Sequence, residues 1–197
     1  KRALEVAAAG HHSLLLLGPP GAGKTMLTRR LTGILPDATL AETVDMTSIH
    51  SVAGLLSERV VDHPFRAPHH TCSVAGLVGG GRPVRPGEVA LAHGGVLFLD
   101  ELAEFRMAAI DSLRQVLRLG HAQGFPARPL LVAASNVCAC GKTGSSRPCT
   151  CSPERIASWR DRLERFGPFD LTVRIVPSGP TDRPGESSAT VRARVEA

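Results

Sequence analysis

Short apolar runs followed by polar or glycine-rich segments recur along the chain and predict alternating strands and helices. The first run, "SLLLL" at residues 13–17, leads through a glycine-rich turn into "MLTRRLTGIL" at residues 26–35, a predicted helix that Gly33 and Pro36 close. Three later runs, at residues 96–99, 128–136 and 169–176, predict further strands. The pattern indicates an α/β fold, a doubly wound parallel sheet with flanking helices.

The glycine-rich turn after the first predicted strand carries a phosphate-binding pattern. Its residues fit G-x-x-x-x-G-K-[ST]: Gly18, Pro19, Pro20, Gly21, Ala22, Gly23, Lys24 and Thr25. Small residues let backbone N–H groups turn toward a phosphate, and the next helix adds its positive end. We expect Lys24 to reach the β- and γ-phosphates of ATP, Thr25 to ligate Mg²⁺ and Met26 to complete the nucleotide contacts. The alternative, an ordinary strand-to-helix turn, is disfavoured because the pattern lies between a strand and a helix.

Two acids follow the predicted strand at residues 96–99. In "GGVLFLDELAEF" the apolar run ends in Asp100 and Glu101. An acid at the end of a buried strand beside the P-loop can hold Mg²⁺, and the next acid can polarise the attacking water. The alternative is an acid that favours the N-terminal end of a helix. We assign Asp100 to Mg²⁺ and Glu101 to the catalytic base.

Two further polar residues are candidates for the same chemistry. Asn136 ends the predicted strand "RPLLVAASN", where its amide can touch the γ-phosphate or the attacking water; the alternative is a turn residue. Arg165 ends a short predicted helix, "RDRLERFG", and can reach a neighbouring subunit's ATP site as an arginine finger. The alternative for Arg165 is a surface residue at a helix C-terminus.

Four of the five cysteines lie in "VCACGKTGSSRPCTCS". They form a C-x-C pair, an intervening loop and a second C-x-C pair: Cys138, Cys140, Cys149 and Cys151. Such pairing can make a tetrahedral thiolate site for Zn²⁺; two disulfides or free thiols are the alternatives. Disulfides are rare in the cytosol, where a P-loop ATPase is expected, so we favour zinc. Cys72 stands alone and is expected to be a small buried residue.

Composition and charge change this interpretation little. The 197 residues are enough for a core, and the chain is 43% hydrophobic. A net charge of +5 permits contact with nucleic acid without establishing it. The sequence has neither an apolar run of membrane-span length nor a signal-peptide h-region, so we expect a cytoplasmic protein with no membrane association. Because the chain starts without Met and enters an ATP site at once, we expect it to be a piece of a longer protein.

Several segments together closely resemble the bacterial ComM/YifB family of AAA+ ATPases, which are similar to the magnesium-chelatase motor subunit. The resemblance covers nearly the whole chain. Its most specific parts are "PFRAPHHTCS" and the paired C-x-C segments, and the others include "GPPGAGKTMLTRRLTGILP", "GGGRPVRPGEVALAHGGVLFLDELAEF" and "GESSATVRARVEA". For His69 and His70 the sequence favours a structured turn, and the resemblance assigns them no role.

The resemblance implies a ring-forming, hexameric ATPase that acts on branched or single-stranded DNA as a branch-migration helicase in natural transformation. It also implies an N-terminal Lon-like domain and a C-terminal helical lid. Residues 1–177 are then the AAA+ core with a zinc-binding loop at 138–151, and residues 178–197 are a linker and the start of the lid, capped by Ser187 or Ser188. Family roles carry over to Lys24, Thr25, Asp100, Glu101, Asn136, Cys138, Cys140, Cys149 and Cys151.

The chain departs from the family pattern at two places. It is short between "SLRQVL" and "FPARP", where the family has a longer hairpin, and between "GP" and "FDLTV", where the family has "LLDR". The segment "LERFG" matches a second chelatase-like pattern and favours Arg165 as the finger. Two functions remain open: a DNA motor, and a chelatase-type ATPase that remodels a protein partner without touching DNA.

Overall fold

A five-stranded parallel sheet forms the centre of the protein. The computed structural model describes residues 1–56, 60, 62–176 and 185–196. The strand order is β2-β3-β6-β1-β7, with the following bounds: β1 (Leu14–Leu17), β2 (Phe65–Arg66), β3 (Val96–Leu99), β6 (Leu130–Ser135) and β7 (Leu171–Arg174). Neighbouring strands pair in parallel, so their carboxyl ends meet at one edge of the sheet. That edge is where open α/β sheets bind their ligands.

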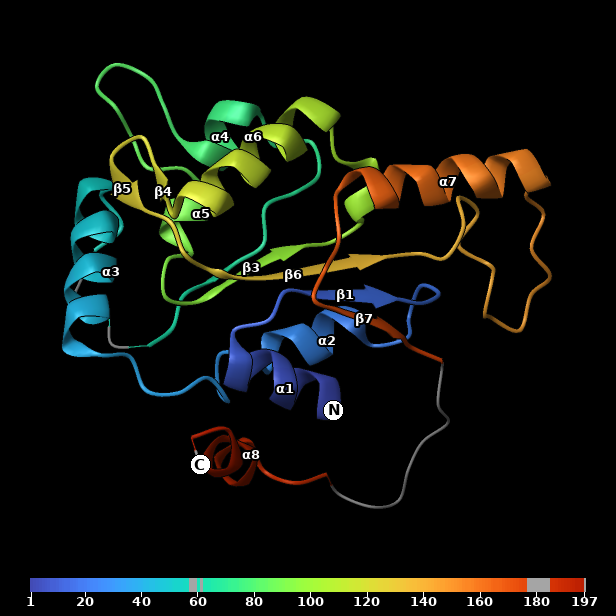
Figure 1. Ribbon diagram of the computed structural model, residues 1–197, viewed down its shortest axis with the longest axis horizontal. Coiled ribbons are helices and arrows are strands. Elements are labelled where there is room, and N and C mark those ends of the chain that lie inside the picture. Colours follow the sequence, from blue (N-terminus) through green and yellow to red (C-terminus); the bar gives the residue numbers. More distant parts are fainter. Residues whose placement is uncertain (57–59, 61, 177–184, 197) are drawn as a thin grey trace.

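Helices cover both faces of the sheet, as predicted for a doubly wound fold (Figure 1). Alternate strand residues point to opposite faces: Leu15 belongs to one buried cluster, and Leu14 and Leu16 belong to the other. The first cluster is completed by helices that lie above the sheet in Figure 1: α4 (Val74–Val78), α5 (Glu88–Leu91), α6 (Met107–Leu119) and α7 (Pro153–Arg165). The second is completed from below by α1 (Arg2–Gly10), α2 (Lys24–Arg29) and α8 (Ser188–Val195).

One more long helix, a short helix and a two-stranded hairpin lie around this core. The helix α3 (Leu40–Val52) begins at a capping box in which Thr39 and Glu42 bond each other's backbone N–H groups. The short helix η1 (Leu102–Glu104) follows β3. The strands β4 (His121–Ala122) and β5 (Phe125–Pro126) form an antiparallel hairpin. This tight hairpin occupies the place where the family pattern is longer.

Two element boundaries differ from the prediction. The helix predicted at residues 26–35 is α2, which begins at Lys24 and ends at Arg29. From Arg30 onward the chain turns, which lets Leu31, Ile34 and Leu35 all become buried against the sheet. The strand predicted at 169–176 is β7, which is shorter.

The reason for the shorter strand lies at its start. The ring of Phe169 stacks on that of Phe166, with centroids 5.1 Å apart. Phe169 therefore packs against the end of α7 and is not part of the strand. β7 pairs with β1 over the four residues Leu171–Arg174.

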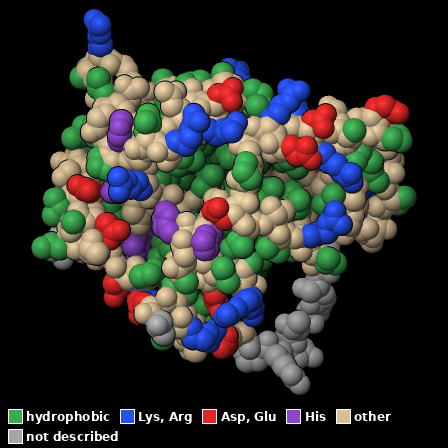
Figure 2. Space-filling view, in the orientation of Figure 1, with side chains coloured by type: hydrophobic (Ala, Val, Ile, Leu, Met, Phe, Trp, Pro, Cys, Tyr) green, Lys and Arg blue, Asp and Glu red, His purple; other side chains and the backbone are tan. Residues whose placement is uncertain are grey.

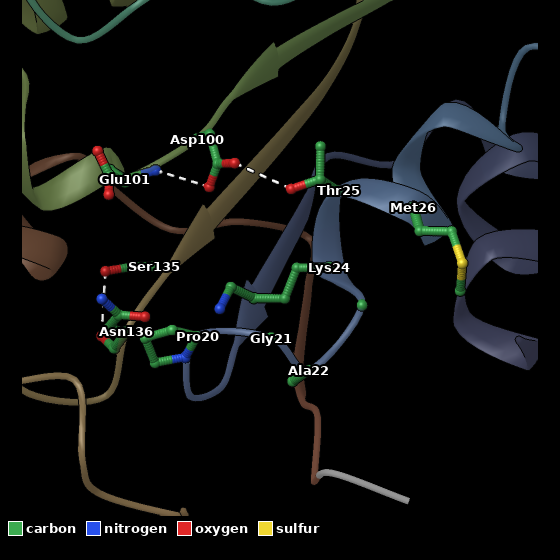
Figure 3. A pocket seen from close by; sticks show the side chains of 11 residues that line it. Pro20, Gly21, Ala22, Lys24, Thr25, Met26, Asp100, Glu101, Ser135 and Asn136 are labelled. Atoms are coloured by element: carbon green, nitrogen blue, oxygen red, sulfur yellow. Dashed lines mark hydrogen bonds between the residues drawn. The ribbon is translucent and has the colours of Figure 1, made fainter. Parts of the chain in front are cut away.

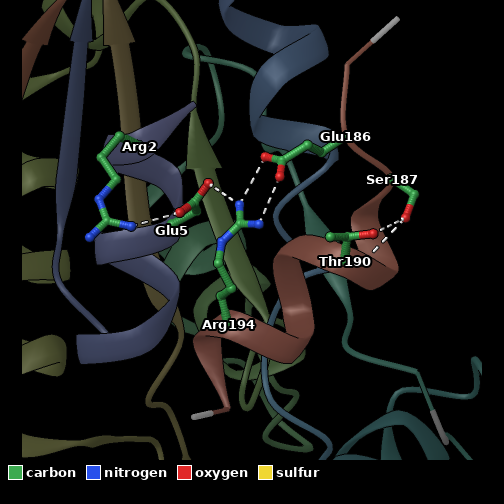
Figure 4. Close-up of polar contacts among 6 residues, drawn as sticks. All are labelled: Arg2, Glu5, Glu186, Ser187, Thr190 and Arg194. Atoms are coloured by element: carbon green, nitrogen blue, oxygen red, sulfur yellow. Dashed lines mark hydrogen bonds and ion pairs between the residues drawn. The ribbon is translucent and has the colours of Figure 1, made fainter.

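The C-terminal helix α8 returns to the N-terminal helix α1. Ser187 is its N-cap and accepts a hydrogen bond from the backbone N–H of Thr190, so the expected cap falls on Ser187. Arg194 joins the two helices because its guanidinium contacts Glu5 and Glu186 (Figure 4). Most of the predicted linker, residues 178–184, lies outside the described residues.

Within the described ranges, no helix combines the length and the apolar character that crossing a bilayer requires.

Candidate nucleotide-binding site

The phosphate-binding turn connects β1 directly to α2. The Gly18 N–H donates to the carbonyl oxygen of Ser135 (3.1 Å). A Cβ on Gly18 would lie 2.6 Å from the carbonyl oxygen of Ile175, so only glycine fits here. Gly23 caps α2 with φ 82°, a left-handed conformation that glycine adopts without strain. The structure therefore explains why the sequence pattern has glycine at positions 18 and 23.

Lys24 lies along the inside of this turn and is 8% exposed. Its Nζ donates to the carbonyl oxygens of Gly18 (2.8 Å) and Pro19 (3.0 Å). Burial lowers the pKa of the Lys24 ammonium, and the carboxylates of Asp100 and Glu101 oppose that shift. Among the described residues, the hydrogen-bond partners of this buried ammonium are neutral carbonyls, so it is prepared to receive an anion.

Thr25 and Asp100 meet across the sheet edge. The Thr25 hydroxyl, at the start of α2, donates to Oδ2 of Asp100 at the end of β3 (3.0 Å; Figure 3). A hydroxyl and a carboxylate are hard oxygen ligands of the kind that Mg²⁺ prefers. These two residues, predicted independently from distant motifs, thus form a pair that fits a magnesium ion.

Glu101 lies beside this pair with its carboxylate turned aside. Its backbone N–H donates to Oδ1 of Asp100 (2.9 Å), and its φ of 53° is left-handed. In Figure 3 its carboxylate lies on the opposite side of Asp100 from Thr25. Its Oε2 is 3.1 Å from Nδ1 of His70.

Asn136 completes the same edge from the end of β6. Its backbone carbonyl accepts hydrogen bonds from the Trp159 indole (2.9 Å) and the Ser135 hydroxyl (3.1 Å). The Trp159 contact attaches α7 to the end of β6. The backbone of Asn136 is therefore held in place, and the residue lines the pocket.

These residues enclose one open cavity of about 360 Å³ (Figure 3). Its lining is as follows: Pro20, Gly21, Ala22, Gly23, Lys24, Thr25, Met26, Asp100, Glu101, Ser135 and Asn136. The structure thus gathers nearly all the predicted nucleotide residues. Gly18 and Pro19 instead supply the carbonyls that hold Lys24. Ser135 was missed because a serine inside an apolar run gives no signal of its own.

The four clustered cysteines also converge, beside this cavity. Their sulfurs all lie within 4.8 Å of one another, and the contacts between Cys138, Cys140 and Cys149 are 3.5, 3.5 and 3.6 Å. Tetrahedral zinc with Zn–S of about 2.3 Å requires sulfurs roughly 3.8 Å apart. All the cysteines are free, which excludes the alternative of two disulfides in this structure. The cluster fits a zinc ion.

Backbone amides favour the metal-binding form of one of these thiols. N–H groups of Thr150 and Lys142 lower the pKa of the Cys140 thiol to about 5. Thr143 donates to the Cys138 sulfur from both its N–H (3.4 Å) and its hydroxyl (3.0 Å). Thiolate is the form that ligates zinc. Cys72 lies apart, half buried at the rim of the first core cluster.

The cysteine loop packs on the outer wall of the phosphate-binding turn. A Cβ on Gly141 would lie 3.2 Å from Cγ of Pro20 and 3.5 Å from Nδ2 of Asn136. A Cβ on Gly144 would lie 3.6 Å from Cδ of Pro19. The loop therefore touches the two prolines that shape the turn, which sequence spacing alone does not reveal.

Arg165, the predicted finger, lies away from this chain's own cavity. It is the last residue of α7, and its side chain is exposed. Its backbone carbonyl accepts a hydrogen bond from Arg114 (3.1 Å). Among the described residues, no carboxylate lies at ion-pair distance from its guanidinium.

Taken together, the sheet order, the phosphate-binding turn and the acid pair define a P-loop nucleotide-binding domain of the AAA+ type. The fold is shared with solved structures of NtrX from Brucella abortus. One of them, described as in complex with ATP, has a TM-score of 0.53 and 19% identity, and covers 89% of this chain and 35% of that one. Another NtrX structure from the same organism has a TM-score of 0.52 and 18% identity, and covers 88% of this chain and 34% of that one.

Sequence comparison identifies the family within this class. Residues 1–181 match the sequence model described as "Magnesium chelatase, subunit ChlI". The chain is 43% identical over 217 residues to "Uncharacterized protein YifB" of Escherichia coli and 45% identical over 214 residues to "Competence protein ComM" of Haemophilus influenzae. It belongs to the magnesium chelatase ChlI family, in its ComM/YifB branch, which confirms the resemblance read from the sequence. The chain spans about 42% of the length of these relatives.

Proposed function

We propose that this chain is the ATP-hydrolysing core of a ring motor that acts on branched DNA. The observation that carries the ATPase proposal is the meeting of Lys24, Thr25 and Asp100 in one cavity. The three residues have two roles in ATP hydrolysis. Lys24 neutralises phosphate charge, and Thr25 and Asp100 hold Mg²⁺. The bound ion supplies further charge neutralisation at the phosphates.

The remaining pocket residues activate the attacking water and position the nucleotide. Glu101 accepts the proton of the attacking water, and the Asn136 amide orients that water or the γ-phosphate. Residues 18–23 and Met26 hold the rest of the nucleotide. Residues 1–177 form the core, and residues 178–197 form a linker and the first part of a lid.

The DNA part of the proposal is supported by the relatives and not by a surface feature. One relative carries the name competence protein, and competence is the uptake of DNA. Basic and acidic side chains are intermixed on the face shown in Figure 2, which presents no uniform basic patch. Contact with DNA then involves another face, the ring pore or the rest of the longer protein. A cytoplasmic location agrees with ATP use and with free cysteines.

A second function is favoured by the family description. The match to a magnesium chelatase subunit supports an ATPase that remodels a protein partner without DNA. The ATPase rate of the full-length protein, measured with and without branched DNA, decides between the two. Stimulation by a branched junction, and none by a duplex of equal length, supports the DNA motor. A rate insensitive to every DNA supports the remodeller.

Glu101→Gln is expected to bind ATP normally and to hydrolyse it on the order of hundreds-fold more slowly, because an amide cannot accept the proton of the attacking water. Steady-state ATPase assays and nucleotide titration of the full-length protein measure the two effects separately. Glu104→Gln is the matched control, since Glu104 is an exposed acid on η1 outside the cavity. If Glu101→Gln hydrolyses ATP at the wild-type rate, the base is another residue.

We also propose that Cys138, Cys140, Cys149 and Cys151 bind one Zn²⁺. Protein purified without chelator is expected to contain one equivalent of zinc, and Cys149→Ser to lose it. Because the loop packs on Pro19 and Pro20, the zinc-free protein should also bind nucleotide more weakly. Cys72→Ser, which removes the one cysteine outside the cluster, should keep both properties. Less than half an equivalent of zinc in wild-type protein, measured by elemental analysis, contradicts this assignment.

A further inference from the structure

A groove lies at the amino ends of the strands, at the edge of the sheet opposite to the phosphate-binding turn. Its lining includes the residues that directly precede three strands: Ser13 before β1, Pro129 before β6 and Asp170 before β7. Because these strands are parallel, the three positions meet at one edge. The end of α6 also lines the groove, which has a volume of about 750 Å³. A molecule bound here does not occupy the nucleotide cavity.

Part of the groove lining is apolar. Leu117, Pro129 and Leu131 line it, and this surface continues into the first core cluster, which contains Leu131 and packs against Leu117. Leu119, the last residue of α6, lines the groove too and is 53% exposed. Covering exposed leucine side chains with an apolar group is favourable because it removes their surface from water. The groove therefore offers a place where apolar side chains of another molecule can be buried.

Two arginines accompany these apolar residues. Arg118 lies in the last turn of α6, and Arg128 follows the β4–β5 hairpin. The Arg128 side chain packs on Gly120, because a Cβ at that glycine would lie 2.8 Å from its Nε. The Arg128 backbone N–H donates to Nδ1 of His93 (3.2 Å), which fixes the start of the side chain. Among the described residues, neither guanidinium has a carboxylate at ion-pair distance, so both charges can receive one from outside.

The one acid in the lining is engaged elsewhere. The hydroxyl and the backbone N–H of Ser13 both donate to Oδ2 of Asp170 (2.7 Å each). These hydrogen bonds lower the pKa of the Asp170 carboxyl, so it is ionised at neutral pH. It nevertheless lies beyond ion-pair distance of Arg118 and Arg128. The groove thus carries two cations on its α6 side and one anion where β7 begins.

We propose that this groove is a docking site for an acidic, leucine-rich segment of a partner protein. A carboxylate of that segment pairs with Arg118 and Arg128, since guanidinium groups bind carboxylates through two parallel hydrogen bonds. Its apolar side chains cover Leu119 and the apolar lining beside it. A nucleic acid fits less well, because its phosphates satisfy the arginines and leave the leucines exposed. The inference goes beyond the proposed ATPase function and does not depend on it.

The test uses the full-length protein and a short fluorescein-labelled peptide of alternating leucine and aspartate. Fluorescence anisotropy is expected to show saturable binding, and the Arg118→Gln/Arg128→Gln double variant should bind about tenfold more weakly, because it loses two ion pairs together. Leu119→Ser should weaken binding as well. The matched control, Arg82→Gln/Arg106→Gln, removes two exposed cations outside the groove and should bind like wild type. A peptide with lysine in place of aspartate should not bind.

Unchanged affinity in the Arg118→Gln/Arg128→Gln variant overturns the proposal, and so does wild-type protein that shows no saturable binding. A labelled single-stranded oligonucleotide is the second probe: if it displaces the peptide and loses affinity in the same variant, the groove binds nucleic acid instead. A smaller assembly of that variant in sedimentation shows that the groove joins copies of this chain, which also overturns the proposal. Lys24→Ala should bind the peptide like wild type, so the groove and the ATPase function are judged separately.

Discussion

Lys24→Ala is expected to abolish ATP binding while leaving the fold intact. Lys24 is the cation of the predicted phosphate-binding turn, and its Nζ donates to the carbonyl oxygens of Gly18 and Pro19. Burial desolvates the ammonium and lowers its pKa, so we expect the loss of this charge to cost the fold little. Phosphate oxygens supply the partner that the ammonium lacks. Nucleotide titration should show no binding, and thermal unfolding should show a midpoint close to that of wild type.

Arg29→Ala is the matched control for that variant. It removes one positive charge from the same helix, but its guanidinium stacks over the Phe65 ring (5.5 Å) and lies outside the cavity. It should bind nucleotide like wild type with a small loss of stability. Normal nucleotide affinity in Lys24→Ala contradicts the P-loop assignment. A thermal unfolding midpoint far below that of wild type shows that Lys24 is instead a structural residue.

The strands and the site residues at their ends were predictable because their signals are local. β1 and β3 are continuous apolar runs, and β6 is one up to its last residue, Ser135, as expected of strands buried on both faces. Once these strands are parallel, Thr25 and Asp100 have to meet at one edge, and the structure places them 3.0 Å apart. The glycine and lysine spacing of the turn is equally local.

Elements with weak local signals were missed or misplaced. β2 has two residues, Phe65 and Arg66, too few for any periodicity, and it exists because β3 offers a neighbour. α3 is different, because the capping-box pair Thr39 and Glu42 is a local signal for its start. The early end of α2 was not predictable, because burial of the following apolar residues against the sheet overrides helix propensity.

Contacts between distant segments were beyond sequence reasoning altogether. The sequence marked His70 as part of a turn, yet only the β2–β3 pairing shows that it faces Glu101. Likewise the cysteine spacing indicated a metal site, but not that Gly141 packs against Pro20. Both contacts join a motif to the ATP site through tertiary structure.

Mixing two inactive variants of the full-length protein is expected to restore ATPase activity if Arg165 acts across a subunit interface. Arg165 ends α7 on the surface, outside its own cavity. In the proposed mechanism Lys24 and a bound Mg²⁺ would neutralise part of the charge that develops on the γ-phosphate, and an arginine supplied in trans would add roughly 10³–10⁵ in rate. Arg165→Ala should therefore bind ATP and hydrolyse it very slowly. The wild-type rate per subunit should rise with protein concentration as rings form.

In the mixture, each variant supplies one of the two contributions to a site shared between neighbouring subunits. Lys24→Ala subunits donate only Arg165, and Arg165→Ala subunits donate only an intact cavity, so mixed rings contain some complete sites. Arg162→Ala, which removes an exposed cation from the same helix about one turn earlier, should keep near-normal activity alone. If the mixture stays inactive while sedimentation shows that each variant still assembles, Arg165 is not the finger. Activity in Arg165→Ala alone leads to the same conclusion, and the trans cation must then come from another arginine.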